Sequence, residues 1–317
     1  MKTKFVSIMI MLSLFSNLNA QSYNGLWRDV NKSLENRLPQ SAEVTLNKIE
    51  QKAIKENNQK ELLKTFLYRF KIFSLQDENP IEASINFAEK NISRLQEPEK
   101  SIFNLAMASL CECYLNENDN MTPEVINQYY EAALSDVATL QNNTTQSYRE
   151  ILTINKDVKK DLESNIEPTL YDYVVHKIIA YVETSLHGVT ELYQDLIAFD
   201  KKNNYIDAAI YNEIHLLKYE YNITDDYDSY FNSLEKIKKE NIDNPLATSV
   251  MALQAEAVLS QQDNETTSQQ EALDICNEAI KLFPNSIGAK QCESIRYEIL
   301  RKELTLSMQS VVLPNQE

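Results

Sequence analysis

The sequence predicts an all-α protein built of antiparallel helix pairs, and three observations lead to this prediction. Apolar residues recur at helical spacing: Leu63, Phe66, Leu67, Phe70 and Phe73 fall at i, i+3, i+4, i+7 and i+10. The joints between such stretches are short and polar, as in "ENNQ", "DENP" and "NIDNP". Only 3 glycines and 8 prolines occur in 317 residues, too few for a turn-rich β protein or a dinucleotide-binding α/β fold.

The same periodicity, read along the chain, gives the expected helices. We expect them over residues 23–35, 39–56, 60–76, 80–95, 98–116, 122–139, 169–186, 189–201, 204–220, 226–240, 244–261, 267–283 and 286–302.

One polar and weakly periodic region interrupts this series. It reads "LQNNTTQSYREILTINKDVKKDLESNIEP" and ends at residue 168. We therefore expect a first helical lobe over 21–140, a loop or joint over 141–168, and a second helical lobe over 169–302.

One stretch of the second lobe has a specific repeat pattern. In "EALDICNEAIKLFPNS", Ala272, Ala279 and Pro284 are seven and five residues apart. This spacing resembles the second half of a tetratricopeptide-like repeat, in which small residues let two helices approach closely and the proline ends the pair. The aromatic and glycine positions of the first half are missing upstream. The fold expected from this resemblance is a tetratricopeptide-like solenoid of helical hairpins.

The chain begins with the features of a secretory signal peptide. Lys2 and Lys4 precede the apolar run "FVSIMIMLSLF", and small residues lead to a cleavage site between Ala20 and Gln21. No cysteine occurs before Cys111, so a lipoprotein anchor is not expected. No later segment is apolar enough to span a bilayer. We expect a leader over 1–20 and an exported protein, periplasmic or extracellular.

The charge balance bears on partners. The formal net charge is -16 and the isoelectric point about 4.8. This acidity argues against nucleic acid as a partner.

Four cysteines are too few for a disulfide-rich scaffold. Cys111 and Cys113 lie two apart on an expected helix and point away from each other, so we predict two buried free thiols. Cys276 and Cys292 lie eight residues on either side of Pro284, so an antiparallel helix pair would bring them opposite each other. They are a candidate disulfide; the alternative is two small core residues.

The sequence offers no candidate active site. The three histidines, His176, His187 and His215, stand in no metal-binding motif, and three glycines cannot form a phosphate-binding loop. No catalytic, cofactor-binding or metal-ligating residue is expected, and no cofactor.

Tyrosine is unusually frequent, with 17 residues against 1 tryptophan. An aromatic ring with a polar tip suits a surface that binds a protein partner. The alternative is ordinary packing between helices. The candidate partner-binding residues are Tyr171, Tyr173, Tyr219, Tyr221, Tyr227 and Tyr230.

Four segments carry a family resemblance. They are "YNGLWRDVNKSLENRLPQSA" after the leader, the following "KIEQKAIKENNQKELLKTFLYRFKI", "EPTLYDYVVHKIIAYV" over 167–182, and the final "LTLSMQSVVLPNQ". Together they resemble, in this order, the N-terminal part of large bacterial alpha-2-macroglobulin-like proteins. In the final segment apolar and polar residues alternate with period 2, which predicts an extended strand over 303–317.

The resemblance implies an exported chain with a helical head followed by β-sandwich domains. In such proteins a protease cuts a bait region and is trapped, sometimes through a thioester. No position of this chain matches the bait or thioester residues, so neither is expected here. The tail at 303–317 would be the start of a missing β domain.

Two functions follow from these patterns. The first is a non-enzymatic exported module, the N-terminal part of an alpha-2-macroglobulin-like protease inhibitor of the cell envelope, whose partner would be a protein or a protease. The alternative is a free-standing periplasmic scaffold of tetratricopeptide type that binds a partner protein or peptide.

Overall fold

The structure, a computed structural model, describes residues 22–115, 122–152, 163–182, 188–261 and 265–301. These residues form helices joined by turns and contain no β-strand; one isolated antiparallel bridge pairs Thr144 with Thr169. The all-α prediction is confirmed for this part of the chain. The leader predicted at 1–20 and the extended tail predicted at 303–317 lie outside the described residues.

The chain divides into two compact units, Met1–Ser185 and Leu186–Glu317. This boundary differs from the joint expected at 141–168. The described part of that region contains short helices, η2 (Thr145–Tyr148), α9 (Arg149–Leu152) and α10 (Glu163–Ile166). Its two ends are also hydrogen-bonded to each other: the amide of Thr145 donates to the carbonyl of Pro168 at 3.2 Å. The region is thereby tied into the first unit.

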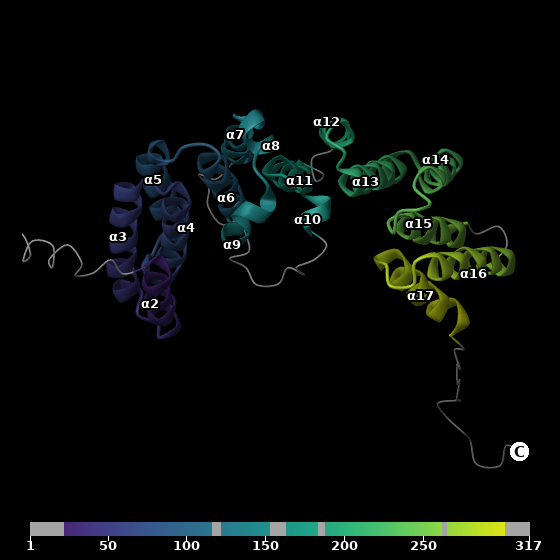
Figure 1. Cartoon of the computed structure of the whole chain (residues 1–317), viewed down its shortest axis with the longest axis horizontal. Helices are drawn as coiled ribbons and strands as arrows, with labels where there is room; N and C mark the ends of the chain where they lie inside the picture. The colour runs from purple at the N-terminus through teal and green to yellow at the C-terminus, as the bar shows by residue number, and fades with distance from the viewer. Residues whose placement is uncertain (1–21, 116–121, 153–162, 183–187, 262–264, 302–317) are drawn as a thin grey trace, which may run out of the picture. The chain divides into compact units, whose positions relative to one another are not determined.

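In the first unit, most helices pack against the helix that follows them in sequence (Figure 1). The short turns between them reverse the chain direction, as expected for helical hairpins. The helices are α2 (Tyr23–Glu35), α3 (Pro39–Glu56), α4 (Gln59–Gln76), α5 (Pro80–Asn91), η1 (Ile92–Arg94), α6 (Glu99–Cys113), α7 (Pro123–Ala133), α8 (Val137–Gln141) and α11 (Leu170–Val182).

The second unit is built in the same way. Each helix packs on the next from α12 to α17, and α17 also packs on α15 (Figure 1). The helices are α12 (Val189–Lys202), α13 (Ile206–Thr224), α14 (Tyr227–Glu240), α15 (Ala247–Ser260), α16 (Glu265–Leu282) and α17 (Ile287–Leu300).

Local sequence signals explain where many of these helices begin. A proline at the first helical position needs no amide partner there, and its fixed φ suits the helix; this is the case for Pro39, Pro80 and Pro123. Elsewhere a polar side chain caps the helix by accepting a hydrogen bond from a first-turn amide. The capping residues are Ser22, Asn58, Asp136, Asp226 and Ser286.

In one place the structure has two helices where the sequence predicts a single helix. The prediction of a single helix over 122–139 was wrong, because α7 ends at Ala133 and α8 begins at Val137. The Asp136 carboxylate accepts hydrogen bonds from both the amide and the hydroxyl of Thr139, which caps a new helix at that point.

Each unit has its own apolar core. In the first unit, α2, α3 and α4 enclose a buried cluster of Leu26, Trp27, Val30, Ala42, Leu46, Ile49 and Ile72. In the second unit, one cluster joins α13, α14 and α15, and another joins α15, α16 and α17. The last cluster consists mainly of small residues, so its helices lie close together.

A close approach of two helices lies at Gly288, near the start of α17. A Cβ atom placed there would lie 2.1 Å from the backbone nitrogen of Ser249 and 2.1 Å from the carbonyl carbon of Thr248, both in α15. Only glycine fits such a backbone-to-backbone contact. The hydroxyl oxygens of Thr248 and Ser286 are 2.7 Å apart, which adds a hydrogen bond to the same contact.

Within the described ranges, no helix combines the length and the apolar character needed to cross a membrane.

Candidate functional site

Four of the six candidate tyrosines lie on α13 and α14 of the second unit. The rings of Tyr221 and Tyr230 stack with centroids 4.4 Å apart and planes 7° from parallel. Tyr227 stacks on Phe231 in the next turn, with centroids 5.6 Å apart. Tyr230 is buried, whereas Tyr219, Tyr221 and Tyr227 are half-buried. The structure therefore brings three of these rings together at the contact of two helices.

Two of these phenols have a raised pKa. Burial, the nearby carboxylate of Glu256 and the phenol of Tyr221 together raise the pKa of Tyr230 to about 12. The pKa of Tyr227 is raised by burial, by Glu271 and by Asp228. A neutral phenol in this position can donate or accept a hydrogen bond but cannot act as a base near pH 7.

The other two candidates, Tyr171 and Tyr173, lie on α11 in the first unit. Tyr171 is buried, with 7% of its surface exposed. Tyr173 is half-buried, and the Lys177 ammonium lies 5.4 Å from the centre of its ring. None of the six tyrosines is exposed. This burial favours packing between helices over a separate binding surface.

Two further tyrosines form partnerships that sequence reasoning missed. The Tyr148 hydroxyl donates to Glu99 Oε1 at 2.7 Å, and the Lys60 ammonium lies 4.0 Å from the Tyr148 ring centre. The Tyr130 hydroxyl donates to the carboxylate of Glu112. Burial and the adjacent carboxylate raise the pKa of both phenols. No local pattern predicts these pairs, because Tyr148 and Glu99 are 49 residues apart in sequence.

A charged cluster in the first unit is internally paired. Glu50 accepts hydrogen bonds from Arg69 at 2.6 Å and from Arg94 at 2.7 Å, one on each carboxylate oxygen. Arg69 also donates to Asn47. Burial by itself raises the pKa of Glu50, but these two guanidinium groups lower it below its ordinary value. The cluster ties α3, α4 and η1 together, which is a structural role.

His176 has a carboxylate partner. Its Nδ1 atom lies 2.9 Å from Oε1 of Glu167, and the imidazole is half-buried on α11. Among the described residues, no three or more histidine, cysteine, aspartate or glutamate side chains are grouped so that they could hold a metal ion.

The cysteines fall into two different environments. Cys111 is buried, and burial raises its pKa to about 11. Cys113 is exposed, so the prediction that both thiols of this helix are buried was wrong for Cys113. Residues two apart on an α-helix point to nearly opposite sides, and at Cys113, the last residue of α6, the side away from Cys111 is exposed.

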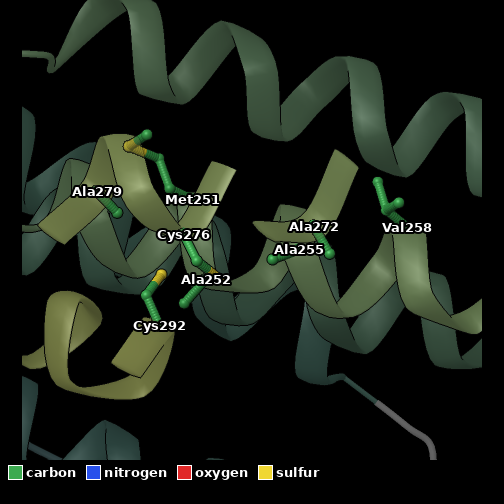
Figure 2. Close-up of a cluster of buried hydrophobic side chains, with 8 residues drawn as sticks. All are labelled: Met251, Ala252, Ala255, Val258, Ala272, Cys276, Ala279 and Cys292. Carbon is green, nitrogen blue, oxygen red and sulfur yellow. The ribbon is translucent and has the colours of Figure 1, made fainter. Parts of the chain in front are cut away.

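Cys276 and Cys292 are both fully buried and carry free thiols in this structure. Figure 2 shows the Cys292 side chain pointing from α17 toward the Cys276 side chain of α16. The neighbouring thiol of each pair member shifts the pKa of the other: the pKa of Cys276 is lowered and that of Cys292 is raised. The structure thus brings together the pair that sequence spacing singled out.

Comparisons of this chain with protein-family models, with curated proteins and with solved structures gave no match.

Proposed function

We propose that this chain is a non-enzymatic, exported helical module, the N-terminal head of an alpha-2-macroglobulin-like protein that inhibits proteases at the cell envelope. The observation that carries this proposal is the structural position of the segments that resemble that family. The distinctive residues of the tryptophan segment and of the "PTLYD" segment are buried and connect helices of the first unit.

The tryptophan segment joins α2 to α4. Trp27 is 5% exposed, and its indole Nε1 donates to Oε2 of Glu61. Two further residues of α4 contact the Trp27 ring: the ring centre of Tyr68 lies 4.8 Å from the ring centre of Trp27, and the Lys64 ammonium lies 4.6 Å from it. Ala42, at the end of the segment, is fully buried in the same core. The segment is therefore a determinant of the packing of the first three helices.

The "PTLYD" segment starts α11. The Asp172 carboxylate accepts from the Thr169 amide at 3.0 Å, and the Asp172 amide donates to the Thr169 hydroxyl oxygen. This reciprocal pair is a capping box, which satisfies amides that a helix start would otherwise leave without a partner. Both residues are buried, with 1% and 0% of their surface exposed. The Thr169 carbonyl also accepts from the Thr145 hydroxyl at 2.7 Å.

The residues that carry the family resemblance are therefore residues that pack and cap the helices of the first unit. It supports the reading that the first unit is a helical head of the same kind, with its function in positioning and in contacts to protein. Such a head would act with a partner protein or a protease and would itself catalyse no reaction. Export through the predicted leader at 1–20 is part of the proposal.

The alternative is a free-standing periplasmic scaffold of tetratricopeptide type. The observation that favours it is the small-residue contact of α15, α16 and α17, where Ala272, Ala279 and Gly288 are buried. The first two are the small residues of the repeat pattern. A stack of such pairs presents an extended surface to a partner peptide.

One experiment distinguishes the two functions. Antibodies against this chain are used on fractionated cells of the source organism, and the reactive product is sized and its N-terminus identified by mass spectrometry. The head proposal expects an exported product several times larger than the 36.6 kDa of this chain. The scaffold expects an exported product slightly below 36.6 kDa that begins near Gln21. A product confined to the cytoplasm with Met1 intact would contradict both.

A further inference from the structure

The last helix pair of the second unit has two thiols at its centre. Cys276 lies in the middle of α16 and Cys292 in the middle of α17, sixteen residues later in the chain. The turn between the helices lies midway, at Pro284. Equal distances from the turn place the two residues at the same level of an antiparallel pair.

The surroundings of the two thiols are apolar and made of small side chains. Both cysteines have 0% of their surface exposed, and they share a cluster with Met251, Ala252, Ala255, Val258, Ala272 and Ala279 (Figure 2). Small residues bring the backbones close, and the Gly288 contact with α15 holds the start of α17. A disulfide requires the two Cα atoms to lie within about 7 Å of each other. Small neighbouring side chains allow the two helices to pack closely, which favours such a distance between the cysteines.

The thiols are also each other's partners. The neighbouring Cys292 thiol lowers the pKa of Cys276, burial opposes this effect, and the Arg296 guanidinium lowers the pKa further. The pKa of Cys292 is raised by the Cys276 thiol and by burial. Cys276 is therefore the thiol that more readily becomes a thiolate, the form that attacks a disulfide.

We propose that Cys276 and Cys292 are a disulfide site that closes α16 against α17 under oxidising conditions. The oxidant is a small or protein disulfide, such as oxidised glutathione. The Cys276 thiolate attacks it, forms a mixed disulfide and releases one thiolate. The Cys292 thiolate then attacks the Cys276 sulfur and releases the second thiolate. The protein loses two electrons and two protons, and the oxidant is reduced to two thiols.

Export, which is part of the proposed function, would supply the oxidising compartment. The pairing of the two cysteines does not depend on it. The exchange occurs while the helix pair forms or opens, because both sulfurs are buried once the pair is closed.

The test begins with the full chain purified under reducing conditions, unfolded, and refolded in oxidised and reduced glutathione. Free thiols are then blocked with iodoacetamide in denaturant without reductant, and the protein is analysed by intact and peptide mass spectrometry. The chain has 4 cysteines. We expect two blocked thiols, Cys111 and Cys113, and one cross-linked peptide pair that joins Cys276 to Cys292.

Matched variants control the assignment. Cys276→Ala and Cys292→Ala should each lose the intramolecular disulfide, and alanine suits a cluster already rich in alanine. Cys111→Ala combined with Cys113→Ala should keep it. The oxidised wild-type chain should melt about 5–10 °C above its reduced form in the transition of the second unit, since a short closed loop restricts the unfolded chain. The Cys276→Ala variant should show no such shift.

Four blocked thiols after oxidative refolding would overturn the proposal, as would a cross-link that includes Cys111 or Cys113. An intramolecular disulfide that persists in either single variant would also overturn it. A separate measurement addresses the compartment. If the pair closes in glutathione but the protein recovered from cells carries four free thiols, the export proposal fails and the disulfide site stands.

Discussion

Replacing Gly288 by alanine tests the close contact between α17 and α15 in the second unit. The added Cβ would lie 2.1 Å from backbone atoms of Ser249 and Thr248. Nonbonded carbon atoms pack at about 3.5–4.0 Å. Because the obstacle is backbone and not the end of a flexible side chain, α17 must withdraw from α15 by roughly 1 Å or more.

The cost follows from overpacking and from what the withdrawal disrupts. Overpacking a well-packed core costs about 1–3 kcal/mol, and a backbone clash belongs at the upper end. The hydrogen bond between Thr248 and Ser286 would lengthen as the helices separate. Alanine regains up to about 1 kcal/mol because it favours helix over glycine. We expect the free energy of unfolding of the second unit to fall by about 2 kcal/mol or more.

The assay is thermal unfolding followed by far-ultraviolet circular dichroism, with hydrogen exchange measured by mass spectrometry. At about 3–5 °C per kcal/mol for a unit of this size, the midpoint should drop by roughly 6–10 °C. Exchange should accelerate in peptides of α15 and α17. Peptides of α2, α3 and α4 should exchange as in the wild type.

Two controls separate steric clash from other causes. Lys290→Ala changes an exposed residue on the same helix and should leave the midpoint within about 1 °C. Gly188→Ala has space around it but sits at φ 78°, so it should cost only about 1 kcal/mol through backbone strain. A Gly288→Ala midpoint within about 2 °C of wild type, with unchanged exchange in α15, would refute the reasoning.

Three further predictions concern single contacts. Trp27→Phe removes the indole donor to Glu61 and some core volume, so thermal unfolding should show the first unit destabilised by about 1–3 kcal/mol. Thr169→Ala removes the cap shared with Asp172 and should cost about 1–2 kcal/mol by urea unfolding, whereas Thr169→Ser should retain most of the stability. Burial raises the pKa of Glu235, but hydrogen bonds from a lysine and a buried glutamine lower it to about 2, so its stabilising effect is present above pH 4.5 and lost as pH falls toward 2. Glu235→Gln should therefore melt below wild type at pH 6 and converge with it only as pH approaches 2; a constant gap would contradict this prediction.

The helices were largely predictable because their signals are local. The expected ranges 23–35 and 39–56 coincide with α2 and α3, and the start of α12 at Val189 was also expected. Apolar spacing, prolines at helix starts and polar caps all act within a few residues. The break at Asp136 was missed because a continuous apolar pattern ran through it, and the cap interaction with Thr139 decided the outcome.

The candidate site was predictable only in part. The spacing about Pro284 singled out Cys276 and Cys292, since a helical hairpin converts equal sequence distances into facing positions. The sequence gives the number of tyrosines but not their positions relative to one another in the folded protein. Their frequency does not reveal that Tyr221 stacks on Tyr230, because that contact depends on how α13 and α14 cross.

The sequence by itself determined that the described part of the chain is helical and where most helices begin and end, because periodicity and capping are short-range properties. The tertiary structure alone decided that Glu99 receives the Tyr148 hydroxyl and that Gly288 must be glycine. It also decided that the first compact unit extends to Ser185. These features arise between segments far apart in sequence, where packing geometry selects the partners, and no local pattern encodes that selection.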